Sequence, residues 1–540
     1  MRLTGIKLTL VLGCLFAAVA YGQTPTVGGL LNNYSFTLPG LPNYGIAQGS
    51  IFDIFGTNLS PVTTSLLTPP LQSTMNGVTV NVTVNGTTTH PLFYFLSSGQ
   101  IAAILPSATP VGPGTITVTT SAGTSDAFPI QVVESAFGLL TTNNGTGPVA
   151  GFNANNNYAY VSYTAAANPG DILELWGTGL GPTPDDATLT EVNVSTEVDI
   201  GGVPATVLYH GRSQFTGLDQ LNVQVPTGVS GCNVSVVVVT GNYVSNLGTL
   251  AVATSGRTCS DPGTGLSADL LQSIASKGSF TSGFISLNKT TTAGITIGGI
   301  TVGGTTTDSG AASFSKITSF STAGYGLTSM GSCSILTFSG QTPPVTVTAT
   351  SLNAGPAINI TGPQGNLAMP LTTSNGISFY STPPNSQFIP AAGGQFHFDN
   401  GSGGTDVGAF TADLTVPTPL VWTNMSSITT VQRSSGVTVN WTGGDPSTYV
   451  TITGMSIETT NGGSSAIGGF FTCIAPVPPG TFTVPPSVLL ALPPSSTIAG
   501  VSISSLTVGN STKTVYFNAP NVDIAGVSAT VSNSTTVTYQ

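Results

Sequence analysis

The chain has 540 residues and a formal net charge of −11 at pH 7, and only 5 % of its residues are charged. With nine Lys and Arg residues it lacks the clustered positive charge that nucleic acid or anionic lipid requires, so neither is expected as a partner. A hydrophobic content of 39 % excludes a disordered chain, and the abundance of Gly, Ser, Thr and Val favours strands and turns over salt-bridged helices. We therefore expect an all-β protein.

Residues 1–22 have the features of a secretory signal peptide. Arg2 and Lys7 precede an apolar run that ends at Ala20, and small residues lead to a cleavage point near Gly22. The run is shorter than the ~20 residues of a membrane-spanning helix, and no later segment is long enough. We expect an exported protein, secreted or at the cell surface, with no transmembrane helix. Cleavage before Cys14, in a loosely lipoprotein-like context, is an alternative that would leave a lipid anchor.

An internal repeat defines the N-terminal half. Residues 49–61 read G-S-I-F-D-I-F-G-T-N-L-S-P and residues 170–182 read G-D-I-L-E-L-W-G-T-G-L-G-P, at an offset of 121 residues. Further on, Gly99-Gln100-Ile101 leading to Pro106 parallels Asp219-Gln220-Leu221 leading to Pro226, at an offset of 120. Two blocks in the same order at nearly the same offset predict two copies of one module, residues 23–134 and 135–253.

The pattern within each copy has a period of two. Valines at positions 78, 80, 82 and 84 alternate with polar residues, which places one set of side chains toward a core. The pairs Asn85-Gly86 and Gly201-Gly202 fall between such runs, as hairpins require. Several short strands within about 110 residues predict tandem immunoglobulin-like β-sandwich domains of about seven strands each.

These motifs carry a resemblance to a known family. The sequence resembles secreted acidobacterial proteins of uncharacterised function with tandem IPT/TIG-like immunoglobulin-fold domains, the Solibacter-type C-terminal domain family. The matching stretches include N-P-G-D-I-L-E-L-W-G-T-G-L-G-P, I-G-G-V-P-A-T-V-L-Y and L-D-Q-L-N-V-Q-V-P, and they lie between residue 40 and residue 253. The resemblance implies the fold and export, but no activity.

The C-terminal half is expected to be β-rich as well. Residues 254–265 are polar and predict a linker. Residues 266–420 predict a further β-rich domain, with one short helical stretch at 268–276. In residues 421–540 strand patterns return, and Trp441 precedes a Thr-Gly-Gly turn as a core tryptophan would. A β-sandwich is expected there.

Four cysteines follow the signal peptide: Cys232, Cys259, Cys333 and Cys473. An even number in an oxidising compartment predicts two disulfides, for which three connectivities exist. The order along the chain favours Cys232 with Cys259 and Cys333 with Cys473.

The sequence contains no recognisable catalytic constellation. It has three histidines, His90, His210 and His397, and no G-x-S-x-G motif; the first two fall beside turns and are expected to be solvated loop residues. Acids that might form a glycosidase pair cannot be paired from sequence and are expected to face solvent: Asp53, Glu174, Asp185, Asp186 and Asp219. We expect no enzyme, and a hydrolase with its site in residues 266–420 is the alternative.

Neither a metal nor a cofactor is expected. The best calcium candidate is the Gly-rich stretch from Asp399 to Asp406, which a plain turn explains as well. The string Gly177-Thr178-Gly179-Leu180-Gly181 lacks the third glycine of a dinucleotide loop and is followed by prolines.

Surface aromatics are the remaining candidates for binding. In the stretch 158–163, Tyr158 and Tyr160 alternate, which would place them on one face, where sugar rings stack well on aromatic side chains. Half-buried strand residues show the same alternation. We expect an exported, non-catalytic multidomain β-sandwich protein with an adhesive, binding or scaffolding role for an unknown extracellular ligand, a polysaccharide or a protein. A carbohydrate-binding protein is the alternative.

Overall fold

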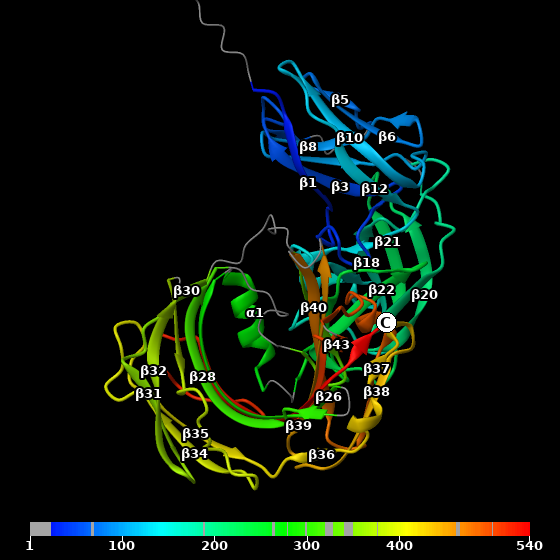
Figure 1. Ribbon diagram of the computed structural model, residues 1–540. Coiled ribbons are helices and arrows are strands. Elements are labelled where there is room, and N and C mark those ends of the chain that lie inside the picture. Colours follow the sequence, from blue (N-terminus) through cyan, green and yellow to red (C-terminus); the bar gives the residue numbers. More distant parts are fainter. Residues whose placement is uncertain are drawn as a thin grey trace, which may run out of the picture.

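The computed structural model describes residues 23–65, 70–186, 189–261, 265–277, 279–297, 300–318, 328–339, 349–374, 376–460, 465–498 and 500–540. The expected signal peptide, with Cys14, lies outside these ranges. Figure 1 shows an all-β chain in which two N-terminal β-sandwiches adjoin a larger C-terminal unit. The predicted fold class is therefore confirmed.

The first sandwich consists of two sheets around a core of valines, leucines and phenylalanines. Val78, Val80, Val82 and Val84 are fully buried and alternate with half-buried polar residues, as the pattern predicted. One sheet has the order β1 (Thr26–Asn32), β3 (Ile51–Thr57), β9 (Gln100–Ile104), β8 (Leu92–Leu96), β4 (Thr64–Ser65). The other has the order β2 (Ile46–Ala47), β12 (Phe128–Val133), β10 (Gly112–Thr120), β6 (Val78–Val84), β5 (Thr74–Met75), and β7 (Thr87–Thr89) and β11 (Gly123–Thr124) pair at its margin.

The second sandwich repeats this arrangement. One half contains β17 (Ala159–Tyr160), β16 (Gly151–Asn153), β18 (Ile172–Thr178), β21 (Asp219–Gln224) and β20 (Val203–Arg212), in that order. The other half contains β19 (Thr196–Ile200), β22 (Gly231–Thr240), β24 (Gly248–Val252), β15 (Thr146–Val149) and β14 (Thr141–Asn143), and the long strand β20 pairs with both β19 and β21. Strands β3 and β9 pair as β18 and β21 do, so the sequence repeat is a structural repeat.

The predicted hairpin turns are present. Asn85 and Gly86 join β6 to β7 with φ angles of 49° and 79°, and Gly201 and Gly202 join β19 to β20 with 63° and 72°. Two successive positive φ angles match the right-handed twist of the flanking strands, and Asn and Gly adopt them at little cost.

A buried polar junction joins the two sandwiches. The Arg212 guanidinium is fully buried and ion-paired to Asp219, whose other oxygen accepts bonds from the amides of Gly179 (2.7 Å) and Leu180 (2.8 Å). Across the junction, the amide and hydroxyl of Ser107 donate to Asp186. Burial raises the pKa of Asp219 to about 6, while Arg212 and the two amides oppose the rise.

The segment expected as a linker, residues 254–265, is anchored where the structure describes it. Arg257 pairs with Asp171 and donates to the Asn168 side chain (2.8 Å), and Cys259 is bonded to Cys232. These contacts hold the segment against the second sandwich.

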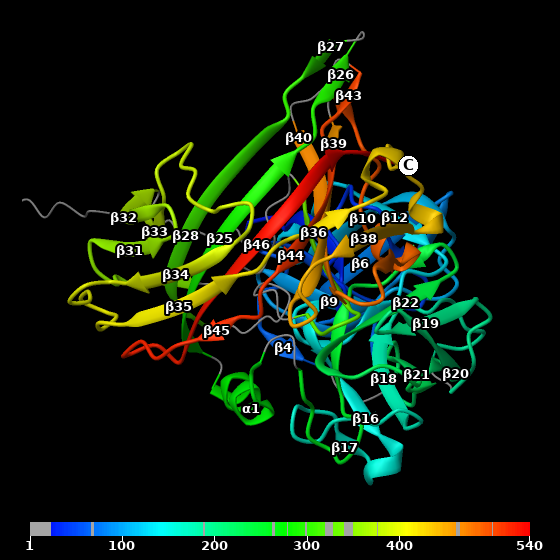
Figure 2. The ribbon, with the colours of Figure 1, turned by 90° about the horizontal axis from the view of Figure 1, so that it is seen from below.

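The C-terminal half is one interleaved unit, whereas two domains, 266–420 and 421–540, were expected. Its largest sheet runs in the order β29 (Cys333–Phe338), β40 (Ser465–Pro476), β39 (Tyr449–Thr460), β44 (Ser505–Ser511), β46 (Ile524–Thr536), β25 (Phe280–Thr292), β28 (Thr305–Ile317), β33 (Ile377–Ser381), β32 (Gly365–Ser374), β31 (Ala357–Gly362), β34 (Gly394–Asp399), β35 (Thr411–Val416). Strand β46 pairs in parallel with β25 over eleven positions, so the expected boundary at residue 420 does not divide this sheet. Figure 2 shows β28, β25, β46 and β44 side by side.

Within the C-terminal unit, two large cores lie against this sheet. One gathers residues from 285 to 416 together with residues from 519 to 531, and the other lies under a small sheet of β36 (Leu420–Trp422), β38 (Val437–Gly443) and β41 (Thr481–Val484). Trp441 is buried in the second core and its indole donates to the Val477 carbonyl (2.7 Å), as expected of a core tryptophan.

The predicted helix is present as α1 (Ala268–Lys277). Leu271 and Ile274 are buried in a cluster that also contains Tyr163 and Ala251 of the second sandwich and Phe280 and Ile524 of the C-terminal unit. The helix therefore packs between the two. The disulfides are Cys232–Cys259 and Cys333–Cys473, and the second spans the expected boundary at residue 420.

Candidate functional site

The outer face of β17, β16, β18, β21 and β20 carries a row of side chains that reach solvent. Strand register places Tyr160 opposite Phe152, Phe152 opposite Glu174, Glu174 opposite Asn222, and Asn222 opposite Tyr209. We call this face the aromatic face and define it by the row together with Trp176, Gln220 and Phe215. In Figure 2 these strands lie at the lower right margin of the molecule.

Strand alternation produces this face. Along β18, Leu173 and Leu175 are buried in the core, while Ile172, Glu174 and Trp176 are half-buried on the other side. In β21, Leu221 and Val223 point inward and Gln220 and Asn222 outward. A period of two sorts the aromatic and amide side chains onto the face that the core does not need.

The face is preorganised by its own contacts. The Trp176 and Phe215 rings lie 6.3 Å apart and tilted, and the Phe152 and Tyr160 rings meet edge to face at 5.7 Å. The Gln220 amide donates to the Asn222 side-chain oxygen (2.8 Å). Burial raises the pKa of Tyr160, so its phenol stays a neutral hydrogen-bond donor at physiological pH. The Glu174 carboxylate has no hydrogen-bond or ion-pair partner among the described residues.

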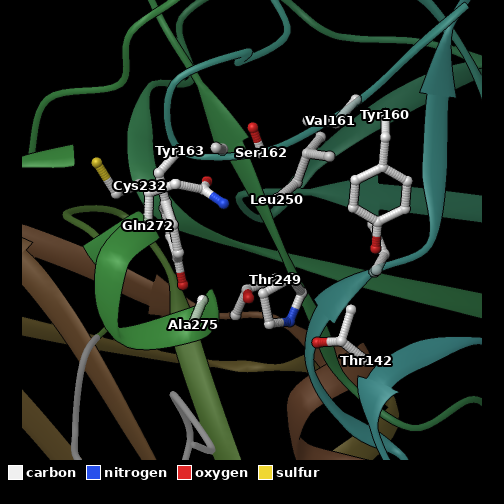
Figure 3. A pocket seen from close by; sticks show the side chains of 13 residues that line it. Thr142, Tyr160, Val161, Ser162, Tyr163, Cys232, Thr249, Leu250, Gln272 and Ala275 are labelled. Carbon is white, nitrogen blue, oxygen red and sulfur yellow. The ribbon is translucent and has the colours of Figure 1, made fainter. Parts of the chain in front are cut away.

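Tyr160 also borders a cavity of about 130 Å³ between the second sandwich and α1 (Figure 3). Most of the wall is apolar, with Val149, Val161 and Leu250 from the sandwich and Ala275 from the helix. The aromatic face and this cavity therefore share one residue.

A second concavity lies on the C-terminal sheet. It has a volume of about 1120 Å³ and is lined by polar side chains of β34 and β35 and by the segments around Asp445 and Lys513. It contains His397, whose Nδ1 lies 2.7 Å from Asp413. A cleft with paired acids or histidines in this region is the feature that the hydrolase alternative requires.

This His–Asp pair has a structural explanation. His397 and Asp413 are direct cross-strand partners, and their side chains are 45 % and 84 % exposed. An exposed cross-strand pair is screened by water and contributes about 0 to 1 kcal/mol to stability. A carboxylate that orients a catalytic histidine is usually buried and held, as in the serine protease triad.

The other predicted site residues are dispersed. His90 is exposed in a loop and bonds to the Asn81 side chain (2.9 Å), as expected. The expectation for His210 is wrong, because it lies within β20 and its Nδ1 is buried with no partner among the described residues. The solvent-facing expectation is also wrong for Asp53 and Asp219, which are fully buried in hydrogen-bond networks.

The two carboxylates of the calcium candidate, Asp399 and Asp406, already accept hydrogen bonds from the chain itself. The Asp399 carboxylate accepts bonds from the Asn359 side chain and the Gly401 amide (both 2.9 Å), and Asp406 accepts the Asn353 amide (2.8 Å). Within the described ranges, no group of three or more His, Cys, Asp or Glu side chains is placed to hold a metal ion. The amides of the Gly177–Gly181 string bind Asp219, as described for the junction.

Of the two tyrosines expected on one face, only Tyr160 joins the row. Asn157 and Tyr158 both have positive φ angles, 51° and 55°, so the chain turns there and the strand alternation begins only at β17. Sequence reasoning missed Trp176 and Phe152 as surface aromatics. The alternation of Leu173, Glu174, Leu175 and Trp176 was the available signal.

These features define an all-β protein with tandem immunoglobulin-like sandwiches. Among the residues that the structure describes, no helix is long and apolar enough to cross a membrane.

No family model and no curated protein matches the chain. Among solved structures, it is similar over 87 % of its length to the extracellular region of plexin A4, at 10 % identity and a TM-score of 0.17, and the match spans 30 % of that chain. It is similar over 38 % of its length to SGBP-B of the Bacteroides ovatus mixed-linkage glucan utilization locus, at 13 % identity and a TM-score of 0.18, spanning 45 % of that chain. SGBP-B from a xyloglucan utilization locus of Bacteroides uniformis matches 86 % of the chain, at 7 % identity and a TM-score of 0.15, spanning 97 % of that chain. At these values the fold class rests on the strand pairing itself.

Proposed function

We propose that the protein is an exported, non-catalytic binding protein that holds an extracellular carbohydrate on the aromatic face of its second sandwich. The observation that carries the proposal is the row from Tyr160 to Tyr209, in which three aromatic rings share a solvent-reaching face with a carboxylate and an amide. Sugar rings present apolar faces that stack on aromatic rings and hydroxyl groups that bond to carboxylates and amides. Trp176 and Phe215 extend this face.

Two further observations support a binding role. The amide pair of Gln220 and Asn222 is fixed by its internal bond, so it loses little conformational entropy when a ligand binds. Glu174 is the carboxylate within the row, and Glu191 lies near Tyr209 at the end of the row. Carboxylates accept hydrogen bonds from sugar hydroxyl groups.

The experiment is a binding panel of soluble polysaccharides, measured by affinity electrophoresis and calorimetry on the full exported chain. We expect Tyr160→Ala with Trp176→Ala to weaken binding at least tenfold, because each lost stacking ring removes about 1 kcal/mol or more. Phe470→Ala is the matched control, since Phe470 is an aromatic residue of similar exposure (42 %, against 39 % for Tyr160) on a strand of the C-terminal unit.

Two results would refute the proposal. One is equal binding by the double variant and the wild type, which would place the ligand elsewhere. The other is release of reducing sugars that a His397→Ala or Asp413→Ala change abolishes, which would establish the hydrolase alternative in the second concavity.

A further inference from the structure

The cavity beside Tyr160 contains polar groups without partners. The Thr249 side chain is only 8 % exposed, and its hydroxyl has no hydrogen-bond partner among the described residues. The buried Oε1 of Gln272, which reaches in from α1, has no such partner either. A buried polar atom without a partner destabilises the protein, so these two atoms favour a ligand that satisfies them.

The local structure aims Thr249 at the cavity. In β24, Leu250 belongs to the core of the second sandwich, whereas Ala251 belongs to the cluster around α1. Strand alternation places Thr249 on the same side as Ala251, toward the helix. The hydroxyl and the amide oxygen therefore approach the cavity from two different elements, and Figure 3 shows both residues on its wall.

The lining requires a specific ligand chemistry. The occupant must be compact and largely apolar, because Val149, Val161, Leu250 and Ala275 form most of the wall. It must also offer a donor to the Gln272 oxygen, which can only accept, and a polar group to the Thr249 hydroxyl, which can donate or accept. An acetamido group meets all three demands, since its methyl is apolar, its N–H donates and its carbonyl accepts. A cavity of about 130 Å³ has room for that group.

We infer that this cavity receives the N-acetyl group of an amino sugar whose ring stacks on Tyr160. The inference rests on the proposed function, because it names the class of carbohydrate held on the aromatic face. Tyr160 joins the two sites, since it borders the cavity and lies at the end of the aromatic row. The face supplies stacking for the glycan, and the cavity supplies the preference for N-acetylated units.

The test uses three β-1,4-linked tetramers, of N-acetylglucosamine, of glucosamine and of glucose, with the full exported chain at physiological salt. We expect the N-acetylated tetramer to bind at least tenfold more tightly than the other two. The chain carries a formal charge of −11, so charge alone would favour the cationic glucosamine tetramer. A preference for the neutral N-acetylated tetramer therefore reports on the acetamido group.

Variants separate the cavity from the face. Thr249→Val keeps the side-chain shape and removes the hydroxyl. It should weaken binding of the N-acetylated tetramer about tenfold and leave the affinity for the glucose tetramer unchanged. Thr249→Ser keeps the hydroxyl and should retain binding. Gln272→Leu is a second, independent variant with the same expected loss, and thermal unfolding of each variant checks that it folds.

The failures of the two ideas are distinguishable. Equal affinity for all three tetramers, lost in Tyr160→Ala and retained in Thr249→Val, would overturn the cavity inference and support the aromatic face. Unchanged affinity of Thr249→Val and Gln272→Leu for the N-acetylated tetramer would overturn the inference as well. If none of the three tetramers binds, the cavity inference is overturned as well. The polysaccharide panel would then be the remaining test of the proposed function.

Discussion

At the scale of single residues, Asp53 makes a testable contribution to pH dependence. Burial raises its pKa to about 6, while the Asn33 and Gln100 amides that donate to it oppose the rise. The folded protein therefore holds the Asp53 proton more tightly than the unfolded chain does. The contribution of this protonated group to the free energy of unfolding is fully present below pH ~4 and is lost as pH rises through about 6. Between its ordinary pKa near 4 and a pKa of about 6, Asp53 changes the free energy of unfolding by about 3 kcal/mol.

The measurement is hydrogen exchange of β3 amides in the full chain, corrected for intrinsic exchange, between pH 4 and 7. Protection of β3 should fall more steeply with pH in the wild type than in Asp53→Asn, because in the variant Asp53 no longer titrates and Asp219, whose pKa is also raised to about 6, still does. Identical slopes in the two proteins would show that the Asp53 pKa is not raised. The sequence pattern placed Asp53 in a strand, but not its burial, because the Asn33 and Gln100 donors come from distant segments.

At the scale of strands, the repeat explains why Gly56 and Gly177 recur at equivalent positions. A Cβ added to Gly56 would lie 2.0 Å from the Thr26 carbonyl oxygen, and one added to Gly177 would lie 2.0 Å from the Phe137 ring. At both positions a neighbouring segment of the chain lies too close for any side chain. We expect Gly56→Ala and Gly177→Ala each to cost about 1 to 3 kcal/mol of stability.

Gly29→Ala is the matched control, because Gly29 also lies in a strand and has nothing within 4 Å of an added Cβ. It should change stability by less than about 0.5 kcal/mol in chemical unfolding. Equal effects of the three substitutions would mean that close approach does not explain the repeated glycines. This element of the fold was predictable, since the repeated strands and the Asn-Gly turn depend on local chemistry.

The candidate site was only partly predictable for a related reason. Alternation indicates that Trp176 and Leu175 point to opposite sides of β18, but not which side another part of the chain covers. That choice depends on packing between distant segments, such as α1 against the second sandwich. Tyr160 was found from its local pattern, whereas the cavity beside it requires a helix more than one hundred residues away in sequence.

At the scale of the whole molecule, the C-terminal half challenges the expected division at residue 420. Strands β25 and β46 are neighbours in one sheet although their paired residues, such as Ser282 and Ile524, are 242 positions apart. Sequence periodicity identifies each strand but not its partner, and pairing over such a distance leaves no local signature. The disulfide between Cys333 and Cys473 also crosses the expected boundary.

Fragments of the chain test this arrangement. Residues 23–261, which keep Cys232 with Cys259, and residues 266–540 should each fold and unfold cooperatively, because each contains complete sheets and cores. Residues 266–420 and 421–540 produced separately should not, because the first leaves β25 without β46 and the second leaves β40 without β29. Circular dichroism and thermal unfolding measure the difference. Cooperative folding of both short fragments would restore the boundary at residue 420, whereas recovery of the folded state only on mixing them would demonstrate that the shared sheet is the unit of stability.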